Sequence, residues 1–239
     1  MCKIEKEGFT LSVKENEIFM NCEPDAQITV LFAKSAVKEM EKIYGPLFTR
    51  MVAEYALEFE AKKLKEEPPP KIQGLDQVTN YIIANLDRYP RGYCALFYGI
   101  AKTEKNLEGS LGSGSRRAVY NAMKAIIESS GVFNSIIGST EDLFEAAAKA
   151  SELMKANNIG ISVRWIRSEN ALVMVVPDCP YKDACREYVN EGISRMVGGL
   201  ECTTLNSQSV ISEVITKKRF DFKLDEFDKP ECRGRVFEV

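Results

Sequence analysis

The sequence contains no histidine. This absence excludes Ser-His-Asp and Cys-His catalysis, because both mechanisms need an imidazole as the proton acceptor. It also excludes imidazole as a metal ligand, so any transition-metal site would have to use thiolates and carboxylates. The chain also lacks two motifs: a phosphate loop, and a G-x-G-x-x-G sequence that follows a strand. It therefore has no binding signature for a hydride-carrying cofactor. We therefore favour a binding or regulatory protein over an enzyme, and keep an oxidoreductase or iron–sulfur accessory protein as an alternative.

The chain has no excess of positive charge and no long apolar run. Its 239 residues carry a net charge of −3, with a pI near 5.4, which argues against binding nucleic acid through phosphate contacts. No segment approaches the roughly 18 apolar residues that a membrane helix needs. The first residues, "MCKIEKEGFTLS", are charged and have no apolar core, so we expect no signal peptide, no membrane span and a cytoplasmic location.

The first third of the chain combines short apolar runs with one long helical pattern. "FTLSV", "EIFMNC" and "QITVLFA" are typical of strands. Apolar residues at steps of three and four predict a helix over residues 35–65, with a break at Gly45-Pro46. The stiff, polar "EEPPPK" predicts a linker. We therefore expect an N-terminal extension over residues 1–70 and a second domain over residues 71–239.

The second domain is expected to mix helices with antiparallel hairpins. Helices are predicted over residues 75–86, 116–129 and 143–154, while "GYCALFYGIA" fits either a buried strand or a short helix. "ISVRWIR" and "ALVMVVP" flank the turn "SEN" and predict a hairpin. "SVISEVIT" and "RFDFKLDEF" around "KKR" predict another hairpin, and "CRGRVFEV" a last strand. The expected fold class is α/β (α+β), with helices packed on an antiparallel sheet.

The order of these segments over about residues 110–239 resembles the 4-vinyl reductase domain family. The resemblance is carried by "LGSGSRRAVYNAMKAI", "STEDLFEAAAKASELMKANNIG", "GISVRWIRSENALVMVV", "CREYVNEG" and "KPECRGRVFEV". It implies a fold similar to vesicle-tethering TRAPP subunits, an apolar ligand pocket, a structural zinc and a homodimer. Cys185 and Cys232 match cysteines of the family, but a further family cysteine about eight residues past Cys232 has no counterpart here.

Four of the seven cysteines lie in the resembling region and are candidate zinc ligands: Cys179, Cys185, Cys202 and Cys232. Their spacing is not a C-x-x-C pattern. However, Cys185 begins a predicted helix, where the helix dipole lowers the pKa of a thiol. Four thiolates would make a closed, structural zinc site. An iron–sulfur cluster, a redox-active thiol and buried unliganded cysteines are the alternatives.

Apolar side chains on the predicted helix 143–154 and on the hairpin could enclose a ligand. The candidate ligand-binding residues are Ile161, Val163, Trp165, Phe144 and Tyr181. Ile161, Val163 and Trp165 alternate along a strand and therefore share one of its sides. A filled core is the alternative, since aromatic side chains usually pack. A protein–protein adaptor of TRAPP-like fold is the rival function, supported by the helix-rich extension.

Overall fold

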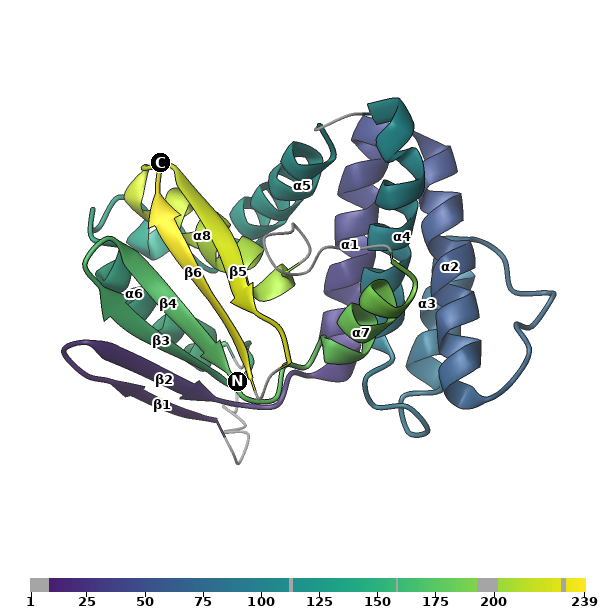
Figure 1. The fold of residues 1–239 in the computed structure, drawn as a ribbon, viewed down its shortest axis with the longest axis horizontal. Coiled ribbons are helices and arrows are strands. Elements are labelled where there is room, and N and C mark those ends of the chain that lie inside the picture. The colour runs from purple at the N-terminus through teal and green to yellow at the C-terminus, as the bar shows by residue number, and fades with distance from the viewer. Residues whose placement is uncertain (1–8, 112–113, 158, 193–201, 229–230) are drawn as a thin grey trace. The chain divides into compact units, whose positions relative to one another are not determined.

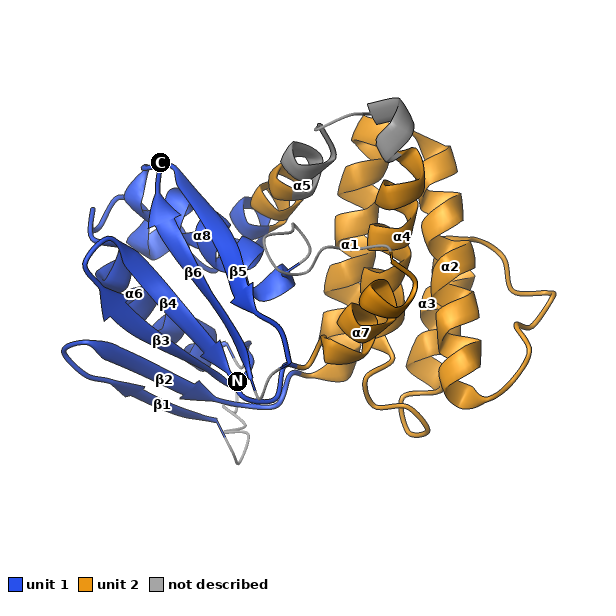
Figure 2. Cartoon of the chain, in the orientation of Figure 1, with its two compact units in different colours: residues 1–24, 127–179, 197–239 blue, residues 25–126, 180–196 orange. Residues whose placement is uncertain are grey.

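The computed structural model describes residues 9–111, 114–157, 159–192, 202–228 and 231–239. Over these residues the protein has eight α-helices, one 3₁₀ helix and one six-stranded antiparallel sheet (Figure 1). The expected α/β fold class with helices packed on an antiparallel sheet is therefore confirmed. The chain forms two compact units (Figure 2). Unit 1 comprises residues 1–24, 127–179 and 197–239, and unit 2 comprises residues 25–126 and 180–196.

Unit 1 contains the whole sheet. Its strands are β1 (Thr10–Val13), β2 (Glu17–Asn21), β3 (Val163–Ser168), β4 (Ala171–Val176), β5 (Phe220–Glu226) and β6 (Cys232–Glu238). They lie in the order β1-β2-β3-β4-β6-β5, with every neighbouring pair antiparallel. Its helices are η1 (Asn134–Ile136), α6 (Leu143–Ala156) and α8 (Thr203–Thr216).

The core of unit 1 lies between one face of the sheet and these helices. α8 packs on β5 and β6, and α6 contacts β1 and β4. Side chains of a strand alternate between its two sides. Most apolar side chains of these strands lie on the side that the helices cover. Ile18, Trp165 and Met174 face one another across neighbouring strands, and all three are buried. Leu205 of α8 lies so close to Gly234 of β6 that a Cβ there would meet its side chain.

Unit 2 is helical. It contains α1 (Ala26–Tyr44), α2 (Pro46–Leu64), α3 (Gly74–Ala84), α4 (Tyr93–Leu111) and α7 (Lys182–Asn190), and α5 (Gly114–Ser130) runs from unit 2 into unit 1. α2 packs most extensively against α4. The two backbones meet closely at Gly99, where a Cβ would lie 2.5 Å from the carbonyl oxygen of Val52. No helix among the described residues is both long and apolar enough to cross a membrane.

Several predicted elements are confirmed. The break at Gly45-Pro46 separates α1 from α2, because Gly45 adopts a positive φ of 83° and Pro46 opens the next helix. The hairpin of β3 and β4, the helix α6 and the last strand β6 also form where expected. "GYCALFYGIA" is helical, within α4. The helix predicted at Cys185 is α7, which begins at Lys182 and ends at Asn190; residues 193–197, to which we expect it to continue, lie outside the described residues.

Two predicted strands are wrong. "QITVLFA" lies in α1, where the carboxylate of Asp25 accepts a hydrogen bond from the Ile28 N–H (3.0 Å) and so caps a helix. "SVISEVIT" lies in α8, which is buried along most of its length. Both segments are short apolar runs whose periodicity does not separate a strand from a buried helix. β5 consequently pairs with β6 and not with the segment that precedes it.

The two compact units do not test the predicted domain ranges. The proline-rich segment 68–70 lies between α2 and α3, inside unit 2. The units describe compactness in the folded chain and do not measure which part folds alone. The division into residues 1–70 and 71–239 therefore stays a prediction.

Candidate functional site

The predicted apolar residues of unit 1 lie on the helix-covered side of the sheet. Val163 and Trp165 share that side of β3, and their exposed fractions are 2% and 3%. Ile161, just before the strand, is also buried. Phe144, in the first turn of α6, is buried, and the guanidinium of Arg167 lies 4.6 Å from its ring centroid. Arg167 thus connects β3 to the start of α6.

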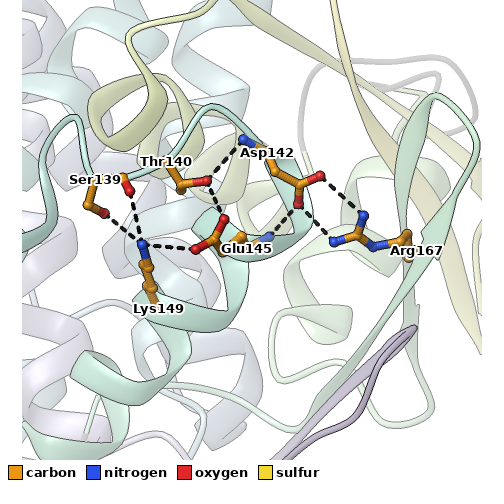
Figure 3. Close-up of polar contacts among 6 residues, drawn as sticks. All are labelled: Ser139, Thr140, Asp142, Glu145, Lys149 and Arg167. Atoms are coloured by element: carbon orange, nitrogen blue, oxygen red, sulfur yellow. Dashed lines mark hydrogen bonds and ion pairs between the residues drawn. The ribbon is translucent and has the colours of Figure 1, made fainter.

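A polar network surrounds the start of α6 (Figure 3). Asp142 caps the helix by accepting a hydrogen bond from the Glu145 N–H at 2.7 Å. Its two carboxylate oxygens also accept hydrogen bonds from the guanidinium of Arg167, at 3.0 and 3.2 Å. Lys149 pairs with Glu145 at 3.1 Å and donates to the backbone carbonyl and hydroxyl of Ser139. All four charged side chains of the network are therefore paired within it.

The hydrogen bonds of this network stabilise the start of α6. The hydroxyl of Thr140 donates to Glu145 at 2.6 Å, and this bond, together with Lys149, lowers the pKa of the Glu145 carboxyl. Such bonds to the ionised form hold a carboxylate charged and fix its position. These contacts fix the side chains of the first turn of α6. Through the pair of Asp142 and Arg167, the network also joins the start of α6 to β3 beside Phe144.

Tyr181, the fifth predicted ligand residue, belongs to unit 2. Its ring packs edge-on against Tyr93, with centroids 5.9 Å apart, and against Phe97 at 4.9 Å. It immediately precedes α7 and helps to hold that helix against α4. Its described ring neighbours are thus aromatic residues of unit 2, whereas the other four predicted residues lie in unit 1.

The four predicted zinc ligands are distributed over both units. Cys179, Cys202 and Cys232 belong to unit 1, and Cys185 lies on α7 in unit 2. Cys179 is half-buried and the other three are buried, and none of them forms a disulfide. Within the described part of the chain, no three His, Cys, Asp or Glu side chains are gathered so that they could hold a metal ion. Zinc and the alternative iron–sulfur cluster therefore stay predictions.

The group that sequence reasoning missed is Glu60 of α2. Its side chain is fully buried, with an exposed fraction of 0%. Neither carboxylate oxygen has a hydrogen-bond partner among the described residues. Buried polar side chains are normally paired, because an unpaired one has lost its contacts with water without replacement. An unpaired buried carboxyl is accordingly a feature that calls for a functional explanation.

Apolar side chains lie beside the Glu60 carboxyl on the side of Gly92. Gly92, just before α4, faces the carboxyl, so that a Cβ on it would lie 3.2 Å from Oε1. The same point is 3.0 Å from Cγ2 of Ile82 and 3.2 Å from Cδ2 of Leu86. Burial in this setting raises the pKa of Glu60 from its ordinary 4.5 to about 8. The carboxyl is therefore mostly protonated at neutral pH and can both donate and accept a hydrogen bond.

Two other polar groups of unit 2, in contrast, have hydrogen-bond partners. The hydroxyl of Tyr89 donates to Asp183 at 2.9 Å. The thiol of Cys94 donates to the carbonyl of Pro180 at 3.4 Å, and burial raises its pKa to about 12. Cys94 is therefore held as an unreactive thiol. Glu60 differs from these two groups because its carboxyl has no hydrogen-bond partner among the described residues.

A weak signal for Glu60 exists in the sequence. The residues at positions 53, 56, 57 and 61 of α2 are buried and apolar, and Glu60 falls on the same helical stripe. An acidic residue on an apolar stripe is a reason to suspect a buried charge. The sequence alone does not show whether a basic partner from another helix meets it.

Comparisons with protein-family models, with curated proteins and with solved structures find no match to this chain.

Proposed function

We propose that this chain binds a small, largely apolar molecule that carries one hydrogen-bonding group, and that Glu60 recognises this group. The observation that carries the proposal is a fully buried carboxyl with no partner among the described residues. Binding sites combine apolar walls with a few polar groups that fix the orientation of the ligand. Ile82, Leu86 and Gly92 supply the apolar surroundings here.

The chemistry of Glu60 sets the class of ligand. A carboxyl protonated at neutral pH matches a neutral hydroxyl or carbonyl group, because it can donate to one and accept from the other. Such a bond offsets the cost of the unpaired buried group, which is about 1–3 kcal/mol. Phenols and isoprenoid alcohols fit this description, and a tetrapyrrole serves as a larger probe with several polar groups. The same classes fit the resemblance to the 4-vinyl reductase domain family.

A second location follows from the sequence. The predicted site in unit 1 lies between α6 and β3, beside Trp165, Val163 and Phe144. Trp165 is the only tryptophan, so its fluorescence reports on unit 1 alone. Glu60 lies in unit 2, which allows one experiment to distinguish the two locations.

The test is a titration of the full chain with a phenol, an isoprenoid alcohol and a tetrapyrrole, followed by native mass spectrometry and Trp165 emission. We expect Glu60→Leu to abolish the bound species. Glu58→Leu is the matched control, since Glu58 is exposed on the same helix. Val163→Phe should leave binding at Glu60 intact, because overpacking there affects unit 1.

The outcomes distinguish a ligand site at Glu60 from one in unit 1. Binding that survives Glu60→Leu but is lost in Val163→Phe, with quenching of Trp165, places the ligand in unit 1. Absence of binding for all three probes contradicts the proposal. The same mass spectra test the structural zinc proposed on Cys179, Cys185, Cys202 and Cys232, for which we expect about one Zn²⁺ per chain.

A further inference from the structure

β5 is an edge strand of the sheet in unit 1 (Figure 1). On one side it pairs with β6, and among the described residues no strand pairs with its other side. An edge strand presents a row of backbone N–H and C=O groups that can pair with another strand. The question is which strand fits this edge.

Two hydrogen bonds show which residues point outward. The N–H of Val239 donates to the carbonyl of Arg219 at 3.1 Å, so Arg219 is directed toward β6. In an antiparallel ladder the residues of a strand alternate between the two neighbours. Phe220, Phe222 and Leu224 therefore direct their backbone groups to the open edge. The N–H of Phe222 agrees with this, since it donates to the side chain of Asp221 at 2.7 Å.

The sequence of β5 is complementary to itself when it is read antiparallel about Phe222. In that register Phe222 lies opposite Phe222 of a second copy. Asp221 then lies opposite Lys223, Phe220 opposite Leu224, and Arg219 opposite Asp225. Each pair is either apolar or of opposite charge. Residues directly opposite each other share a face of the sheet, so these pairs are in contact.

We propose that two copies of this chain associate through β5, antiparallel and centred on Phe222, to form one continuous sheet. The backbone geometry fits this register. Phe220, Phe222 and Leu224 all direct their groups outward and meet one another, which is the arrangement required for hydrogen-bonded pairs. The β-bulge between Leu224 and Glu226 ends the regular ladder, so the paired segment is short and defined.

The charges on β5 are better compensated in this dimer than in the monomer. Within the sheet Lys223 lies directly opposite Arg235 of β6, a like-charge arrangement that destabilises a sheet. Arg235 pairs with Asp225 at 3.4 Å, and Lys223 has no ion-pair partner among the described residues. Asp221 of the second copy supplies the missing negative charge. Symmetry supplies the same pair a second time.

A protected edge is the competing interpretation. A lysine in the middle of an edge strand and a bulge at its end both discourage pairing in many proteins. The hydrogen bond from Phe222 to Asp221 would also have to be exchanged when a second strand approaches. The two interpretations differ in the oligomeric state of the chain and in its response to exchanging the two charges.

The experiment compares the oligomeric state of the full chain and three charge variants by sedimentation equilibrium. Lys223→Asp and Asp221→Lys each place like charges opposite one another at two symmetric positions. We expect either change to weaken the dimer about tenfold or more. The double variant D221K/K223D restores opposite charges and should restore the dimer. Lys14→Asp, an exposed charge reversal after β1, should leave it unchanged.

Hydrogen exchange of the unmodified chain provides an independent readout. The amides of Phe220, Phe222 and Leu224 should become more protected as protein concentration rises. A chain that remains monomeric overturns the proposal. So does a dimer that is equally stable in all variants, or a double variant that folds but stays monomeric. If a variant fails to fold, the exchange of these amides in the unmodified chain decides.

Discussion

At the scale of single residues, Glu60 links stability to pH. Burial raises its pKa to about 8, whereas in the unfolded chain it titrates near 4.5. The folded state therefore holds the proton more tightly, and the free energy of unfolding falls as the pH rises from about 4.5 to about 8. At about 1.4 kcal/mol per pH unit, the loss over this range amounts to a few kcal/mol.

We expect Glu60→Gln to remove this pH dependence. The amide cannot ionise, so the variant should be more stable than the unmodified chain at pH 8 and should differ less from it at pH 5. Urea denaturation at pH 5, 6.5 and 8 measures the effect. Glu58→Gln is the control and should keep the original pH profile. Parallel profiles for Glu60→Gln and the unmodified chain would show that Glu60 ionises freely in the folded state.

At the scale of elements, the start of α6 depends on one carboxylate. Asp142 caps the helix and also pairs with Arg167 of β3. Asp142→Ala removes both contacts, and we expect it to cost about 1–2 kcal/mol of unfolding free energy, most of it from the cap. Asp142→Asn should cost less, because asparagine also caps helices. Chemical denaturation of both variants measures the difference.

The neighbouring Glu141 provides the control for this pair of variants. It is exposed, and among the described residues its ion-pair partner is Lys218, at a distance of 3.9 Å. Glu141→Ala should therefore change stability by less than about 0.5 kcal/mol. Equal costs for Asp142→Ala and Asp142→Asn would mean that the pair with Arg167, and not the cap, holds the helix.

Elements with strong local signals were predictable from the sequence, and long-range pairings were not. The turn after Ser168 and the Gly45-Pro46 break are local features, and both are in place. The strand assignment of "SVISEVIT" failed because β-branched residues suit a strand as well as a fully buried helix such as α8. The pairing of β2 with β3 joins segments far apart in the chain. The sequence of neither segment identifies the strand with which it pairs.

The candidate sites follow the same division. The alternation of Val163 and Trp165 along β3 could be predicted from the sequence, because it depends only on the period of a strand. The unpartnered state of Glu60 was not, because it depends on α3 and on the segment before α4 offering no donor. Self-complementarity of β5 could be recognised only once the sheet order placed that strand at an edge.

At the scale of the whole molecule, the first two strands complete the sheet. Ile18 lies opposite Trp165, and Met20 lies opposite Val163. Deleting residues 1–24 would turn β3 into an edge strand and uncover these apolar side chains. We expect a red shift of Trp165 emission, lower stability and aggregation. Fluorescence and light scattering measure these effects, and a truncated chain with unchanged emission and cooperative unfolding would contradict the expectation.

The interleaving of the two units has a consequence for how the chain can be cut. The backbone passes from one unit to the other at 24/25, 126/127, 179/180 and 196/197. A single protease cleavage at 126/127 yields two fragments, each of which carries parts of both units. Neither unit can be released whole by one cut, so cleaved protein should keep its native mass until a denaturant separates the fragments. For the same reason, neither unit can be exchanged between genes as one uninterrupted cassette.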